Sequence, residues 1–284
     1  MCEIPRLCSQ ARVARDDIGV FLAEASFCVY PTHDGAFLGP SRRPASSNGG
    51  GRHLCNDQGR VAINDDWGER VIYELRTYTL KPGTVPAYLK LNAEVGRPVR
   101  GDRYGKLIGA WTTEFGTLNQ YVHLWEYADA NERDRLRADL AQNPDWAPGY
   151  TSQIRPFMLK QENTFLSLDE DIGLRSVEGS GHIYELRTYS ALPGAIGGWA
   201  AGFKRSLAQR ETHSKLVGLW TTEVGGLNAA KHLWVYDSLQ HRTAVREAMA
   251  ADKELLAQRA TGGPSPLIGQ ESVILIPTKV SPLQ

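Results

Sequence analysis

Two short stretches of the chain carry an acid, a base and a phenol at alternate positions. The first contributes Glu74, Arg76 and Tyr78, and the second contributes Glu185, Arg187 and Tyr189. Burying an isolated charge costs several kcal/mol, so these charged groups must be paired or must reach water. In one interpretation, each arginine binds an anionic ligand through a bidentate contact. In the other, each Glu and Arg form a structural ion pair.

Histidines that precede tryptophans by two residues form a second set of candidates. His123 is followed by Trp125, and His232 is followed by Trp234. In a strand this spacing puts both rings on one face. Each histidine could act as a general base near neutral pH or as a haem ligand, or it could be a hydrogen-bonded core residue beside aromatic rings. The candidates for proton chemistry are His123, His232, Tyr78 and Tyr189.

The ligand-binding residues that we predict combine both sets. They are Glu74, Arg76, Tyr78, His123, Trp125, Glu185, Arg187, Tyr189, His232 and Trp234. Other chemistries lack their motifs, because the sequence has no Gly-x-Ser-x-Gly elbow, no phosphate-binding glycine loop ending in Lys-Ser/Thr and no His-Glu-x-x-His helix. The four cysteines all precede residue 56 and match no zinc spacing. We therefore predict no metal site and no cofactor, with haem kept as the alternative.

An internal repeat must position these residues. The hexapeptide Tyr-Glu-Leu-Arg-Thr-Tyr occurs at 73–78 and again at 184–189, 111 residues later. A second block, 111–127, aligns without gaps on 220–236 with 11 of 17 residues identical, at an offset of 109. The chain therefore contains two copies of one unit, and two residues have been lost between the blocks in the second copy.

Each copy shows the pattern of an α+β unit. The hexapeptide alternates as a strand does, and it is followed by a Pro-Gly turn and a helical pattern. Two aromatic-rich runs then predict a hairpin, charged segments at 131–142 and 239–259 predict a helix, and residues 162–166 and 271–276 predict a last strand. The order β-α-β-β-α-β is typical of a ferredoxin-like sheet with both helices on one face.

The domain organisation follows from these elements. We predict a first domain over 71–168, a linker over 169–181 and a second domain over 182–277. Each sheet keeps an uncovered face rich in aromatic residues, and such a face must be buried against another surface. We expect the two sheets to pack face to face as an intramolecular barrel. Residues 1–66, rich in Gly, Pro, Ser and Arg, are predicted to be a disordered extension or a gene-model artefact.

Composition limits the partners. Lys+Arg and Asp+Glu are equal at 32 each, so we predict no nucleic-acid partner. No apolar run is long enough to span a membrane. Because the repeats contain no cysteine, a reducing compartment is favoured, and we expect a cytoplasmic protein, or a mitochondrial one in a eukaryote.

The repeated motifs resemble those of the NIPSNAP family. The resemblance rests on Tyr-Glu-Leu-Arg-Thr-Tyr followed by Lys-Pro-Gly, and on the block from Trp-Thr-Thr-Glu to His-Leu-Trp-Glu-Tyr; the second copy has Leu192 in place of the lysine. It implies a tandem dimeric α+β barrel in which the chain is its own pseudo-dimer, with further homo-oligomerisation left open. Related barrel families include cofactor-free oxygenases, haem-dependent enzymes and isomerases.

Two functions remain at this point. The first is binding of a small hydrophobic or amphipathic ligand between the two sheets, with oxygenase- or isomerase-like activity as an open question. The alternative is a non-catalytic structural or protein-interaction module whose barrel interior is filled. A cavity lined by the Arg, His and Tyr positions would favour the first, and paired Glu and Arg beside a filled interior would favour the second.

Overall fold

The computed structural model describes residues 70–261 and 263–284. The segment predicted as an extension, 1–66, lies outside the described residues. The first repeat contains strands β1 (Ile72–Leu80), β2 (Lys106–Thr113), β3 (Gln120–Tyr127) and β4 (Met158–Leu168). Its helices are α1 (Val85–Leu91), α2 (Arg97–Arg100), α3 (Ala130–Gln142) and α4 (Ser152–Ile154), with π-helical turns at Asn92–Gly96 and Ala147–Thr151 and a 3₁₀ turn at Arg155–Phe157.

The second repeat has the same order of elements. Its strands are β5 (Ile183–Ala191), β6 (Leu216–Val224), β7 (Ala229–Tyr236) and β8 (Leu267–Pro277). Its helices are α5 (Ile196–Arg205), α6 (Leu207–Glu211), α7 (Leu239–Ala251) and α8 (Lys253–Ala260). The segment predicted as one helix over 239–259 is divided at Asp252, whose side chain accepts a hydrogen bond from the backbone N–H of Leu255 and so caps α8.

The eight strands close into one barrel. Their order is β1-β3-β2-β8-β5-β7-β6-β4, so the last strand of each repeat lies beside the second strand of the other. Closure depends on the length of β4 and β8, which are longer than the sequence indicated. In β4 the segment 158–166 pairs with β1, and the end, 165–168, pairs with β6. The predicted intramolecular α+β barrel is confirmed.

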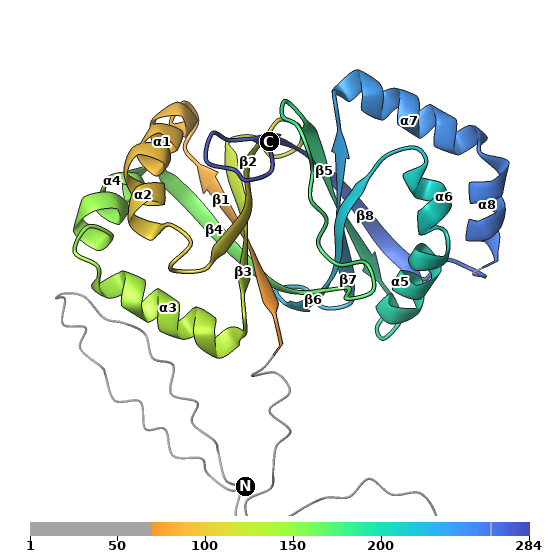
Figure 1. Cartoon of the computed structure of the whole chain (residues 1–284), viewed down its shortest axis with the longest axis horizontal. Helices are drawn as coiled ribbons and strands as arrows, with labels where there is room; N and C mark the ends of the chain where they lie inside the picture. Colours follow the sequence, from red (N-terminus) through yellow and green to blue (C-terminus); the bar gives the residue numbers. More distant parts are fainter. Residues whose placement is uncertain (1–69, 262) are drawn as a thin grey trace, which may run out of the picture. The chain divides into compact units, whose positions relative to one another are not determined.

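Helices cover only the outside of this barrel. In Figure 1, α1–α4 lie against the outer face of the first sheet and α5–α8 against the outer face of the second. Each of these helices in the described part of the chain is too short or too polar to act as a membrane-spanning segment. The two sheets therefore face each other directly, without a helix between them.

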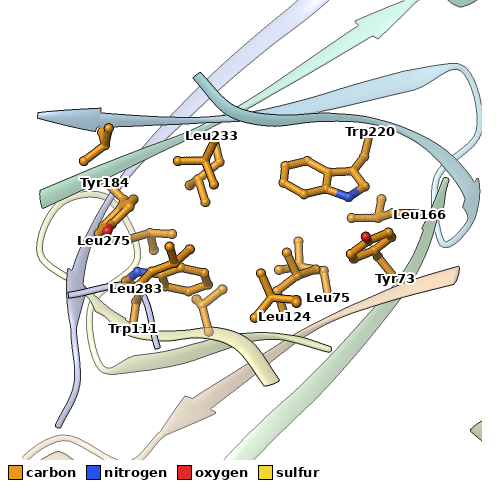
Figure 2. Packing of buried hydrophobic residues seen from close by; sticks show 14 residues of the cluster. Tyr73, Leu75, Trp111, Leu124, Leu166, Tyr184, Trp220, Leu233, Leu275 and Leu283 are labelled. Carbon is orange, nitrogen blue, oxygen red and sulfur yellow. The ribbon is translucent and has the colours of Figure 1, made fainter. Parts of the chain in front are cut away.

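The barrel interior is filled by apolar side chains from both repeats. Figure 2 shows ten of them pointing into the space between the sheets: Tyr73, Leu75, Trp111, Leu124, Leu166, Tyr184, Trp220, Leu233, Leu275 and Leu283. The ring of Tyr73 packs edge-on against Trp220 at 5.9 Å between centroids. A void among these residues measures about 10 Å³, no more than one water. The described residues leave no ligand-sized cavity between the two sheets, so that prediction was wrong.

Candidate functional site

Two pockets lie on the other side of the strands, between each sheet and its own helices. The pocket in the first repeat, called the first pocket below, has a volume of about 300 Å³. The pocket in the second repeat, the second pocket, has a volume of about 690 Å³. Both are in or near the range of small-molecule sites. The polar face of β1 and β5 therefore faces the helices and not the barrel interior.

The floor of the first pocket comes from β1 and β3. Register pairs Arg76 with His123 across the two strands, and Tyr78 with Tyr121. These four side chains line the pocket together with Trp125. The second pocket repeats this floor with Arg187, Tyr189, His232 and Trp234 from β5 and β7. The structure thus brings eight of the ten predicted ligand-binding residues together in two equivalent pockets, and Glu74 and Glu185 do not line them.

Glu74 lies behind the floor and does not line the pocket. Its carboxylate is fully buried and accepts hydrogen bonds from Arg76 at 2.8 Å and from Arg133 of α3 at 2.7 Å. Burial alone would raise the pKa of Glu74, but the hydrogen bond from Arg133 and the charge of Arg76 lower it to about 2. Glu74 therefore stays ionised, and its role is to hold Arg76 in place.

The second repeat builds the same support with one more donor. Glu185 is also fully buried, and its carboxylate accepts hydrogen bonds from Arg187 at 2.9 Å, Arg242 of α7 at 2.6 Å and Ser272 of β8 at 2.5 Å. Against the effect of burial, the bonds from Arg242 and Ser272 lower the pKa of Glu185 to about 2. The ion pair that the sequence left as one of two interpretations is present in both repeats.

A buried arginine in each pocket was missed by the sequence reasoning. The Arg100 guanidinium lies over the ring of Trp125 at 3.3 Å and donates to the hydroxyl of Tyr127 at 2.8 Å. Arg210 lies over Trp234 at 3.9 Å in the same way. Neither forms a salt bridge with a carboxylate in the described part of the chain. Burial lowers the pKa of Arg100 and of Arg210, because each is a desolvated cation.

His123 and His232 are both neutral hydrogen-bond donors. The indole N–H of Trp125 donates to Nδ1 of His123 at 2.6 Å, and Trp234 donates to Nδ1 of His232 at 2.6 Å. An indole can only donate, so Nδ1 is the acceptor and Nε2 carries the proton. Burial first, and then the charge of Arg187, lower the pKa of His232 to about 3.

His123 follows the same rule, and burial and Arg76 lower its pKa well below the usual value. The Nε2 atoms of both histidines are buried and have no hydrogen-bond partner among the described residues. A buried N–H without a partner costs stability, so it is most useful where a ligand can accept its hydrogen bond. Both rings line their pockets.

Comparison with known proteins places this architecture in a family. The NIPSNAP family model matches residues 73–170 and 184–282. The chain belongs to the NIPSNAP family. It is 31% identical over 217 residues to human NipSnap homolog 3A, covering 75% of this chain and 86% of that protein. It is 28% identical over 213 residues to the NipSnap homolog of Dictyostelium discoideum, covering 74% and 88%.

More distant structures share the barrel. A Lactobacillus acidophilus protein, whose name proposes a monooxygenase activity, superposes with a TM-score of 0.54 at 9% identity, over 76% of this chain and 100% of that chain. At this identity the likeness shows the fold alone. The chemistry of this NIPSNAP chain must therefore be argued from its own pockets.

Haem does not fit these NIPSNAP pockets. Iron would need a lone pair on Nε2, but the tryptophan fixes the proton on that atom in both His123 and His232. Within the described residues, no cluster of three or more His, Cys, Asp or Glu side chains is arranged to hold a metal ion. The donor set of each pocket is instead an N–H, a phenol and several guanidinium groups.

Proposed function

We propose that this NIPSNAP-family protein binds small amphipathic anions in the layer between each sheet and its helices. The observation that carries the proposal is the pairing of two groups in each pocket. One is the Nε2–H of His123 or His232, and the other is the buried guanidinium of Arg100 or Arg210; in the described part of the chain the former has no acceptor and the latter no carboxylate. An N–H donor beside an unneutralised cation suits a carboxylate or another oxyanion.

The walls of the pockets supply the apolar half of the site. In the second pocket they include Trp199, Phe203 and Met249, and in the first pocket Trp146, Ile154 and Leu140. Apolar walls with a few convergent polar groups are typical of small-molecule sites. The barrel interior formed by the described strands, in contrast, has no room for a ligand, so binding is proposed only in the outer layer.

In this arrangement the histidines predicted as general bases act as hydrogen-bond donors instead. A general base needs a free lone pair, but Nδ1 of each histidine is occupied by tryptophan and Nε2 is protonated. Tyr78 accepts a hydrogen bond from Arg76 at 2.9 Å, which leaves its own O–H free to donate. Two donors at one place would stabilise a developing oxyanion. Oxygenase- or isomerase-like turnover stays a prediction that only an activity assay can test.

The non-catalytic alternative is supported by part of the structure. The barrel interior is filled, and Glu74 and Glu185 are fully paired, as a purely structural module requires. That alternative gives no reason for an unpartnered His Nε2–H and a desolvated arginine to recur together in both repeats. Ligand binding accounts for both.

Calorimetric titration of the full chain with decanoate tests the proposal, with decanol as the neutral control. We expect decanoate to bind and decanol to bind at least about tenfold more weakly, because it lacks the charge. The double variant Arg100→Gln/Arg210→Gln should lose decanoate binding. Arg135→Gln is the matched control, since Arg135 is exposed and pairs with Asp139 on the surface of α3. Equal heats for the wild type and the double variant would refute the proposal.

A further inference from the structure

The two pockets differ in what fills the space above their common floor. In the first pocket the amide of Asn92 bridges two phenols. Its nitrogen donates to the Tyr150 hydroxyl at 2.9 Å, and its oxygen accepts from the Tyr121 hydroxyl at 3.2 Å. The Tyr88 ring packs on Tyr121 at 5.0 Å. These three aromatic rings and the amide occupy the space beside the floor and leave the smaller cavity.

The second repeat replaces this network. Ala230 pairs with Tyr189 across β5 and β7, as Tyr121 pairs with Tyr78 in the first repeat. Arg259 follows Tyr150 at the 109-residue offset that relates the β4 and β8 strands. One ring is thus reduced to a methyl group, and a second is exchanged for a guanidinium. The second pocket is more than twice as large, at about 690 Å³ against 300 Å³.

Several cations line the enlarged pocket without acidic partners. Arg205, Arg210, Arg246 and Arg259 all line it, and no Asp or Glu is among its described lining residues. Arg210 is buried, whereas Arg205, Arg246 and Arg259 lie at the exposed rim. In the first pocket, by comparison, Arg97 is neutralised by Asp102 at 2.8 Å, so that three lining arginines, Arg100, Arg137 and Arg155, form no salt bridge among the described residues, against four in the second pocket. The second pocket therefore has the larger surplus of positive charge.

A phosphate group matches this surplus better than a carboxylate. A phosphate monoester carries close to two negative charges at neutral pH and offers three acceptor oxygens. Arginine binds such a group through bidentate contacts. His232 adds the Nε2–H at the floor, where it has no partner among the described residues. The side chains of Trp199, Phe203 and Met249 leave an apolar surface for the rest of the molecule.

We propose that the second pocket binds an organic phosphate monoester with an apolar group, and that the first pocket, narrowed by its tyrosines to about 300 Å³, does not. The inference rests on the proposed function, since it names the ligand class for one of the two sites. The two repeats have kept the same floor and have diverged in their walls. The second repeat is then the principal binding site of the chain.

Titration of the full chain with decyl phosphate, decanoate and inorganic phosphate tests this assignment. We expect decyl phosphate to bind at one site per chain, about tenfold or more tighter than decanoate, because it carries the second charge. Inorganic phosphate should bind more weakly than decyl phosphate, because it lacks the apolar group. Decanoate binding as tightly as decyl phosphate would overturn the phosphate assignment and leave the proposed function intact. Absence of binding by both would overturn the two together.

Two variants locate the site. Ala230→Tyr should restore the first repeat's ring and reduce decyl phosphate affinity at least about tenfold. Arg259→Gln, at the exposed rim, tests the charge without disturbing packing and should remove most of the preference for phosphate over carboxylate. Arg135→Gln in the first repeat is the matched control. Unchanged binding in a folded Arg259→Gln protein, as judged by its melting temperature, would contradict the proposal.

A phosphate monoester can come from a soluble metabolite or from a lipid headgroup. Sedimentation with phosphatidylcholine vesicles, with and without phosphatidic acid, separates the two sources. Binding only to vesicles that contain phosphatidic acid would support the assignment and identify a lipid source. If the chain binds decyl phosphate below its micelle concentration and ignores both vesicles, the assignment stands with a soluble ester as ligand.

Discussion

The two faces of strand β1 differ in chemistry and in packing. Tyr73 and Leu75 point into the barrel and meet apolar side chains of the second repeat. Glu74 and Arg76 point outward to the helices and a pocket. One face is filled and uncharged, and the other holds buried charges beside a cavity. Strand β5 repeats this division with Tyr184 inside and Glu185 outside.

The difference between the inner and outer faces shows which neighbours a buried charge requires. A fully buried carboxylate inside the barrel would face mainly apolar side chains; Glu126, on the same face as Tyr73, is partly exposed and pairs with Lys106 at 2.9 Å. On the outer face, α3 and α7 add Arg133 and Arg242 as a second cation for each glutamate. The interior does hold one long cationic side chain, Lys231, which donates to the Thr188 hydroxyl at 2.9 Å and whose pKa is lowered by burial. The helices, in contrast, bring cations to a carboxylate that they neutralise. Charge and cavity therefore occur together in the outer layer.

The largest expected effect is the loss of an interior ring. Trp220 is 1% exposed and is packed by residues of both sheets. Trp220→Ala should lower the free energy of unfolding by about 3 to 5 kcal/mol, through lost burial and the cavity left behind. Urea unfolding measures it. Leu227→Ala, at a position 71% exposed in the β6–β7 turn, is the control and should change stability by less than about 0.5 kcal/mol. Equal effects would mean that the interior is not the main core.

A smaller effect is expected from the outer-layer carboxylate. Glu74→Gln removes the anion that neutralises Arg76 and that shares Arg133 with Asp134, and it should cost about 3 kcal/mol. Arg76→Gln should cost clearly less, because Arg133 still holds Glu74 at 2.7 Å. Urea unfolding of both variants compares them. If Arg76→Gln is the more damaging, Arg133 does not share the charge, and the helices matter less than proposed.

The sequence predicted the elements and which residues share a face. The repeat revealed the order of elements twice, and the two-residue period grouped Glu74, Arg76 and Tyr78 as well as His123 and Trp125. It did not reveal which face the helices cover, because periodicity is symmetrical between the faces. The lack of charge at Tyr73 and Leu75 was the available signal, since the uncharged face suits a filled interior.

The other site residues, Arg133, Arg100 and Arg210, could not be predicted from local sequence patterns. Arg133 is 59 residues from Glu74 in the sequence, and no local pattern predicts their contact. Arg100 and Arg210 lie where the second copy has lost two residues, so the offset between the repeats hides their equivalence. Aligning the two copies around Arg100 and Arg210 would have found them. The volumes of the two pockets depend on Tyr150 and Arg259, whose placement only the tertiary structure gives.

A pH-dependent effect of about 2 kcal/mol is expected from His232. Its pKa is about 3 in the folded chain and 6.5 as a free side chain, so below pH 6.5 the unfolded state binds a proton that the folded state does not. Stability should therefore fall as the pH drops from 7 to 5, by about 2 kcal/mol for this residue. His232→Phe should lose that much less over the same interval, as measured by urea unfolding at both pH values.

The difference in stability between pH 7 and pH 5 is not affected by consequences of His232→Phe that are equal at both pH values. His232→Phe leaves the Trp234 N–H without its acceptor, but that cost is the same at pH 7 and pH 5. The carboxylates Glu74 and Glu185, with pKa values of about 2, lose their contribution only as the pH falls from about 4.5 toward 2. An identical pH response in the variant and the wild type would show that His232 is accessible to protons in the folded chain.

The smallest effect on stability, and the sharpest on function, is expected at Arg137. Its pKa is lowered by burial and then by the positive charge of Arg76, so it is a cation held beside another cation. Among the described residues it forms no salt bridge, and removal strands no carboxylate. Arg137→Gln should change the free energy of unfolding by less than about 0.5 kcal/mol, and it should weaken decanoate binding in the first pocket. The charge of Glu74 offsets only part of the cost of holding Arg137 buried beside Arg76, so we expect Arg137 to contribute to ligand binding and little to folding. A destabilisation comparable to that of Glu74→Gln would instead make Arg137 part of the structural ion-pair network, and the functional distinction between the two faces would then be lost.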